Sequence, residues 1–179
     1  KNAASVRDSA KALQEDSLAL LSKGKDSVFT KKNVRQDDGT VKSEYDTDAI
    51  YKAVSKFVKD YNSTIESAAS SEDSSVLSST ASMVKATKAN SNLLADVGIS
   101  IGSDNKLTID EKAFKSANMT DVKSIFNGTG SYAYGIASSS SNIYNKSVSQ
   151  LANLNGYSYT STGSYSSYQY TGSLYSQYK

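Results

Sequence analysis

The clearest helical pattern in this chain is DTDAIYKAVSKFVKDYNSTIESAA, residues 46–69. Its large apolar side chains recur at steps of four, three, four and four residues, the spacing of one face of an α-helix. These side chains are Ile50, Val54, Phe57, Tyr61 and Ile65. Asp46 or Thr47 can cap the first turn, and the polar run 70–73 predicts a turn after the helix. We therefore expect a long amphipathic helix whose apolar seam is buried.

Helices are also predicted on both sides of this segment. Residues 3–22 predict a helix whose stripe consists of Val6, Ala10, Leu13, Ser17 and Leu20. Its charged side chains, Asp16 among them, are expected outside the stripe, and Gly24 is expected to stop the helix. A third, continuous helix is predicted from Val76 to Val97, which would form an antiparallel helical hairpin with the helix at 46–69.

The rest of the chain predicts short elements, one more helix and a tail. Residues 33–45, with Asp-Asp-Gly at 37–39, and residues 98–109 predict two small β-hairpins, because polar and apolar residues alternate around turn residues. Asp110 and Thr120 are expected to cap two short helices, and a last helix is expected from about 131 to 154. Residues 155–179 are rich in Tyr, Ser and Gly.

Together these elements predict a mainly α fold, an elongated antiparallel, coiled-coil-like helical bundle with one or two small β-hairpins and a Tyr/Ser-rich C-terminal tail. We expect a helical domain at 1–154, with hairpin insertions at about 28–45 and 98–109, followed by the tail at 155–179. Because the sequence begins with Lys1 rather than Met, we also expect that an N-terminal piece has been removed.

Composition excludes several classes of function. Among the 179 residues there are 35 Ser but no Cys, His, Trp or Pro. Disulfides, thiolate metal sites and Ser-His or Cys-His catalytic pairs are therefore absent. Composition does not exclude a Ser-Lys or carboxylate pair, but the sequence contains no plausible catalytic constellation, and we expect no enzyme activity, cofactor or metal. The acidic loop around Asp104 does not match a calcium loop, because Lys106 and Ile109 stand at the third and sixth positions. The formal net charge is only +2, and no cluster of basic residues forms a face that would bind nucleic acid. No apolar run is long enough to span a membrane.

Four short motifs in a fixed order carry a family resemblance. They are FVKDYN at 57–62, LADVGI at 94–99, NKLTID at 105–110 and FNG at 126–128. This succession, over about residues 47–145, resembles the helical C-terminal part of flagellar filament-capping, hook-associated proteins. In that family the motifs are followed by a long coiled-coil helix, which pairs with an N-terminal helix inside the filament. In this chain they are followed by the Tyr/Ser-rich tail. The resemblance implies a secreted structural or assembly protein, bacterial and flagellar, that acts through helix–helix association with other protein subunits, either copies of itself or flagellar-type components.

The tail supports an alternative function. An extracellular adhesin or binding module at the cell surface could reuse the helical domain and recognise a cell-surface or glycan ligand through tyrosine side chains, which make adaptable contacts at little entropic cost. The candidate interaction residues are Tyr157, Tyr159, Tyr165, Tyr168, Tyr170, Tyr175 and Tyr178. The sequence leaves open whether these rings pack on their own bundle, bridge subunits or form the binding platform.

Overall fold

The structure is a computed structural model that describes the backbone of residues 2–161 and the side chains of residues 2–154. The described part contains seven α-helices, a short 3-10 helix and four strands in two hairpins, so the expected mainly α fold with two small hairpins is confirmed. In chain order the elements are α1 (Asn2–Leu21), η1 (Gly24–Asp26), β1 (Lys32–Arg35), β2 (Val41–Glu44), α2 (Thr47–Ala69), α3 (Ser74–Ala89), α4 (Ser91–Asp96), β3 (Ile99–Ile101), β4 (Leu107–Ile109), α5 (Glu111–Ser116), α6 (Met119–Phe126) and α7 (Tyr132–Ser161).

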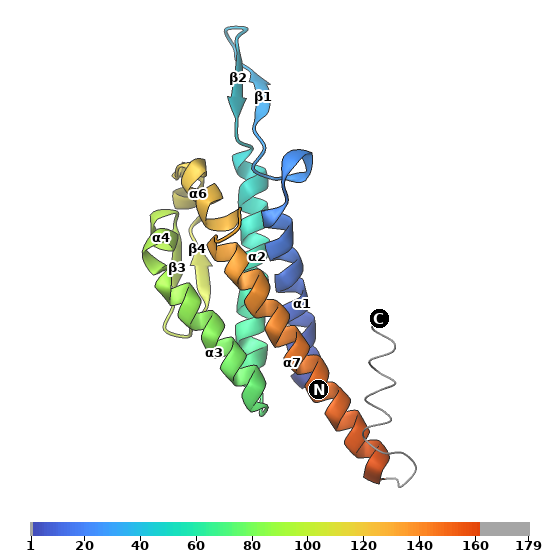
Figure 1. The fold of residues 1–179 in the computed structure, drawn as a ribbon. Helices are drawn as coiled ribbons and strands as arrows, with labels where there is room; N and C mark the ends of the chain where they lie inside the picture. The colour runs from blue at the N-terminus through green and yellow to red at the C-terminus, as the bar shows by residue number, and fades with distance from the viewer. Residues whose placement is uncertain (1, 162–179) are drawn as a thin grey trace.

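The long helices lie along one another in an elongated bundle (Figure 1). Helix α1 packs against both α7 and α2, and α7 also packs against α3. Helices α1 and α7 run in opposite directions. The β1–β2 hairpin projects from one end of the bundle, and the C-terminal part of α7 projects from the other (Figure 1). The smaller elements, from α4 to α6, cover the side of α2 near the hairpin end.

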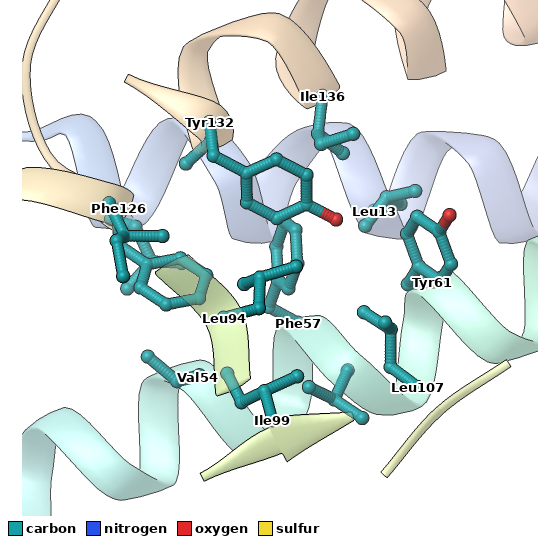
Figure 2. Packing of buried hydrophobic residues seen from close by; sticks show 14 of the residues in the cluster. Leu13, Val54, Phe57, Tyr61, Leu94, Ile99, Leu107, Phe126, Tyr132 and Ile136 are labelled. Carbon is teal, nitrogen blue, oxygen red and sulfur yellow. The ribbon is translucent and has the colours of Figure 1, made fainter. Parts of the chain in front are cut away.

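Helix α2 forms as its sequence predicts. The Asp46 side chain caps it by accepting a hydrogen bond from the Ala49 backbone N–H. All five predicted seam residues are buried. They face apolar residues from α1, α4, the β3–β4 hairpin, α6 and α7, and Figure 2 shows Phe57 beside Phe126, Tyr132 and Leu94 in this core. The core therefore lies where α2 meets the elements that follow it in the chain.

Two predicted features of the helices are wrong in detail. The third helix is interrupted at Asn90, which separates α3 from α4. The Asn90 side-chain amide donates to the Ala86 carbonyl, and asparagine competes in this way with the backbone hydrogen bonds of a helix. Helix α6 is capped by Asn118 rather than by Thr120, because the Asn118 side chain accepts from the Thr120 N–H.

Asp16 does not lie on an exposed face of α1. Its side chain is buried, with 7% of the residue exposed, because α1 packs against α2 as well as α7 and so buries more than one stripe. The last helix also differs from its expected range, since α7 continues beyond residue 154 to Ser161. Residues 162–179, most of the predicted tail, lie outside the described residues.

The two hairpins have different surroundings. All eight residues of β1 and β2 are exposed, with Lys32 opposite Glu44 in the register. In the β3–β4 hairpin, Ile99 pairs with Ile109, and both Ile99 and Leu107 are buried. The Asn62 side chain of α2 exchanges two hydrogen bonds with the Leu107 backbone, at 2.7 and 2.8 Å. The buried side chains of the β3–β4 hairpin therefore join the core of the bundle, whereas no strand residue of the β1–β2 hairpin does.

The turn into β3 requires a glycine. Gly98 has a φ of +82°, and a methyl group added there would lie 2.9 Å from the Phe114 backbone nitrogen. We expect Gly98→Ala to lower the free energy of unfolding by more than the roughly 1–3 kcal/mol that the backbone conformation alone costs. Gly130→Ala is the matched control, because Gly130 has a φ of +85° and open space around it. Urea denaturation should show a larger loss at Gly98, and equal losses would show that the close approach to α5 has no cost.

Candidate interaction surface

Small side chains alternate with larger apolar ones where α1 meets α7. One row of buried residues in α1 recurs at alternating steps of three and four, which is the spacing of a coiled-coil seam, and one row in α7 follows the same rule. They are Ala3, Val6, Ala10, Leu13, Ser17 and Leu20 in α1, and Ala133, Ile136, Ser140, Ile143 and Ser147 in α7. Alanine and serine let two helices approach closely. The contact between α1 and α7 is therefore formed by close packing of these side chains.

The buried serines of this seam are satisfied within their own helices. The Ser17 hydroxyl donates to the Leu13 carbonyl at 2.8 Å, and the Ser140 hydroxyl donates to the Ile136 carbonyl at 2.6 Å. Ser147 likewise donates to the carbonyl of Ile143. Because no hydroxyl is left unpaired, the serines carry no desolvation penalty. They serve as small residues in the seam, which explains how a serine-rich helix can be buried.

The row of α7 continues toward the projecting end of the helix, where Ala152, which lies off the row, is still buried. The next positions in the alternation are Gln150, which is partly buried, and Leu154, which is 53% exposed. Figure 1 shows this end of α7 extending beyond the first residues of α1. Leu154 therefore lies on a projecting helix at a position that is buried elsewhere along the same helix, and the end of α7 is the candidate surface for a partner helix.

The motif residues behind the family resemblance join distant parts of the chain. The Asn127 amide group donates to the carbonyls of Leu20 and Ser22, at 2.6 and 3.1 Å, and its Oδ1 accepts from Lys23. These bonds satisfy carbonyls at the C-terminal end of α1 that have no partner within the helix. Asn62 of α2 bonds the backbone of β4, and Gly98 forms the turn into β3, so the four motifs hold α2, the β3–β4 hairpin and α6 on the bundle.

A buried hydroxyl links three helices. The Tyr61 phenol donates to the Thr87 hydroxyl at 2.9 Å, and the same Thr87 oxygen lies 2.9 Å from the Tyr132 phenol. Burial raises the pKa of Tyr61 and raises that of Tyr132 further, so both phenols stay protonated at neutral pH. Thr87 therefore satisfies two buried phenols, one from α2 and one from α7.

Replacing Thr87 with valine should cost roughly 1–3 kcal/mol of stability, because valine has nearly the same shape and leaves two buried phenols without their partner. Thr80→Val on the same helix is the matched control, since the Thr80 hydroxyl bonds only the Val76 carbonyl of its own helix. Denaturation curves should separate the two variants. Equal curves would show that the hydroxyl network contributes nothing beyond packing.

Three charged groups meet between α1 and α2. Lys56 Nζ lies 2.6 Å from Asp16 Oδ1 and 3.3 Å from Asp60 Oδ2, while Asp16 Oδ2 is buried without a hydrogen-bond partner in the described structure. Burial, followed by the neighbouring Asp60 carboxyl, raises the pKa of Asp16 to about 7. Sequence reasoning placed Asp16 at the surface, and a signal for this site was present in the charge pattern i, i+4 of Lys56 and Asp60.

The predicted tyrosine site lies almost entirely outside the described structure. Tyr157 and Tyr159 belong to the C-terminal part of α7, where only the backbone is described. Tyr165, Tyr168, Tyr170, Tyr175 and Tyr178 lie outside the described residues. The tyrosine site therefore stays a prediction.

No metal-binding group occurs among the described side chains, since nowhere do three or more acidic side chains lie close enough to share an ion. Within residues 2–161, none of the helices has the length and apolar character needed to cross a membrane. Comparison of the chain with models of protein families, with curated proteins and with solved structures gives no match.

Proposed function

We propose that this chain is a secreted structural protein that assembles with other protein subunits through helix–helix association, as its motifs suggest by their resemblance to the helical domain of the flagellar filament cap. The proposal includes no catalytic step. The observation that carries it is the projecting end of α7, where a seam that is buried against α1 continues with Leu154 half exposed. A partner helix would bury this position as α1 buries the earlier ones.

Two further observations support this proposal. The α1–α7 pair is antiparallel and uses coiled-coil spacing, which is the kind of association that the resemblance implies. The residues of the four motifs hold this helical unit together through Asn62, Gly98 and Asn127, so the motifs coincide with structural requirements of the unit.

The proposal is tested first on copies of this chain, because two identical helix ends can form a self-complementary pair. Sedimentation velocity over a range of concentrations should show an oligomer, and the melting temperature should rise with concentration. Leu154→Glu should abolish both effects, since it places a charge in the new interface. Leu93→Glu is the matched control, because Leu93 on α4 is 54% exposed and should tolerate the change.

A flagellar-type component is the second partner to be tested. If copies of the chain stay monomeric, binding of the labelled protein to the ends of purified bacterial filaments should be saturable and sensitive to Leu154→Glu. A protein that neither self-associates nor binds filament ends would contradict the proposed function, as would Leu154→Glu and Leu93→Glu having equal effects.

The adhesin function is distinguished from this proposal by truncation. A chain ending at residue 161 keeps every described helix but loses Tyr165, Tyr168, Tyr170, Tyr175 and Tyr178. If the tail is a binding platform, the truncated protein should keep its melting temperature and assembly state and lose only binding to a cell surface or glycan. Loss of assembly on truncation would instead make the tail part of the subunit interface.

A further inference from the structure

A positively charged cavity lies where the end of α1, the η1 turn and the end of α6 meet. Its volume is about 280 Å³, just below the range of roughly 300–1,000 Å³ that is usual for small-molecule sites. Lys23, Lys31 and Lys123 line it, and none of its lining residues carries a carboxylate. The buried Phe29 and the half-buried Tyr45 supply the apolar part of its wall. The cavity is therefore distinct from the α7 surface and has a different chemistry.

Two of the three lysines contact neutral groups. Lys23 Nζ donates to Asn127 Oδ1 at 2.7 Å, and Lys31 Nζ lies 4.9 Å from the centre of the Tyr45 ring. In the part of the chain that the structure describes, no ion pair joins either lysine, or Lys123, to a carboxylate. This contrasts with the lysines that pair with carboxylates elsewhere, which are Lys32, Lys56, Lys106 and Lys115. The positive charge at the cavity is thus not neutralised by an adjacent acid.

The groups that position this charge are fixed before any ligand arrives. Asn127 is buried and bonded to the carbonyls of Leu20 and Ser22, so its Oδ1 holds Lys23 in a defined place. The Thr30 hydroxyl donates to the Gly24 carbonyl at 2.6 Å, which closes the η1 loop beside the cavity. A site whose polar groups are already in place loses less conformational entropy on binding than one that must be ordered.

We propose that this cavity binds a small polyanion through phosphate or carboxylate oxygens. Lysine ammonium groups are compact point charges suited to such oxygens, and charge-assisted hydrogen bonds of this kind are stronger than neutral ones. Lys23, Lys31 and Lys123 would contact the anionic groups, and the Tyr45 ring would contact the less polar part of the ligand. This site is independent of the proposed helix–helix association.

The test is an NMR titration of the ¹⁵N-labelled full chain at low ionic strength, with inorganic pyrophosphate in one arm and citrate in the other. We expect saturable shifts of the backbone amides around Lys23, Thr30 and Asn127, with a dissociation constant of about 1 mM or lower. Binding should weaken as salt is added, because these lysines are exposed to solvent. Saturation with pyrophosphate alone assigns a phosphate ligand, and saturation with citrate alone assigns a carboxylate ligand.

The double variant Lys31→Gln, Lys123→Gln should weaken binding at least about tenfold, equivalent to about 1.4 kcal/mol. Lys25→Gln is the control, because Lys25 belongs to the neighbouring η1 turn but does not line the cavity. Its effect should stay within about twofold. Unchanged melting temperatures will verify that all variants fold, as is expected for exposed lysines. Shifts that do not saturate in either arm, or equal losses in the double variant and in Lys25→Gln, would overturn the proposal.

Discussion

Replacing Phe57 with alanine is expected to lower the free energy of unfolding by about 3–5 kcal/mol. Phe57 is fully buried, and its ring centre lies 5.5 Å from that of Phe126 and 5.9 Å from that of Tyr132, both in edge-on arrangements (Figure 2). The three rings come from α2, α6 and α7. Alanine would remove the apolar contacts and leave a cavity that three separately anchored helices cannot close. Urea denaturation monitored by circular dichroism measures the loss.

Lys59→Ala on the same helix is the control for this prediction. Lys59 is exposed two residues from Phe57, so its removal should change stability by no more than about 0.5 kcal/mol. The comparison keeps the helix and the introduced residue constant and varies only burial. If the Phe57→Ala variant unfolds at the same urea concentration as the parent protein, Phe57 is not packed between α2, α6 and α7 as described.

The buried seam of α2 could be predicted because it depends on local spacing alone. Side chains at i, i+3 and i+4 share one face of a helix whatever lies opposite, so Ile50 to Ile65 were identified without knowing their partners. Tight turns and most caps are local in the same sense. Both hairpins and the cap at Asp110 are confirmed, and Asp46 is the cap of the two candidates, Asp46 and Thr47. The cap of α6 lies two residues before the predicted Thr120.

Two features were harder to predict from the sequence: how wide the buried face of α1 is, and where the predicted third helix breaks into α3 and α4. Asp16 is buried because α1 is packed on two sides, and nothing in residues 3–22 specifies a second neighbour. At Asn90 the apolar spacing continues across the break from α3 into α4, so the period alone predicts one helix. The Asn90 side chain donates to the Ala86 carbonyl at the break, and apolar periodicity carries no information about such a polar contact.

Long-range polar contacts lay beyond sequence reasoning. Asn127 reaches Leu20, which lies 107 positions earlier in the chain, and Thr87 joins Tyr61 to Tyr132 across 26 and 45 positions. A single asparagine or threonine has no period and no preferred sequence distance to its partner. The cationic cavity depends on such a contact, since the bond between Asn127 and Lys23 joins the end of α6 to the loop that follows α1. The exposed Leu154 on α7 is not among the predicted interaction residues, and the predicted tyrosines lie beyond the described side chains, so their role stays a prediction.

The stability of the protein should fall as the pH rises from 5 to 8, and Asp16 should be the cause. Burial raises the pKa of this carboxyl from 3.8 to about 7, so between these values the folded state keeps a proton that the unfolded state has lost. The state that binds more protons is stabilised by acid, and the free energy of unfolding therefore decreases with increasing pH until Asp16 ionises in the folded protein. With about 1.4 kcal/mol per pH unit, the change between pH 5 and 7 is at most about 3 kcal/mol.

Urea denaturation at pH values from 5 to 8 should show this fall in the parent protein and a nearly flat profile in Asp16→Asn. The contrast is interpretable because the chain has no histidine, whose ordinary pKa would place its titration in this range. Asp96→Asn is the matched control, since Asp96 is exposed at the end of α4 and should leave the slope unchanged. A slope that persists in Asp16→Asn would assign the pH dependence to another group. A flat profile in the parent protein would mean that Lys56, 2.6 Å away, keeps Asp16 ionised despite its burial.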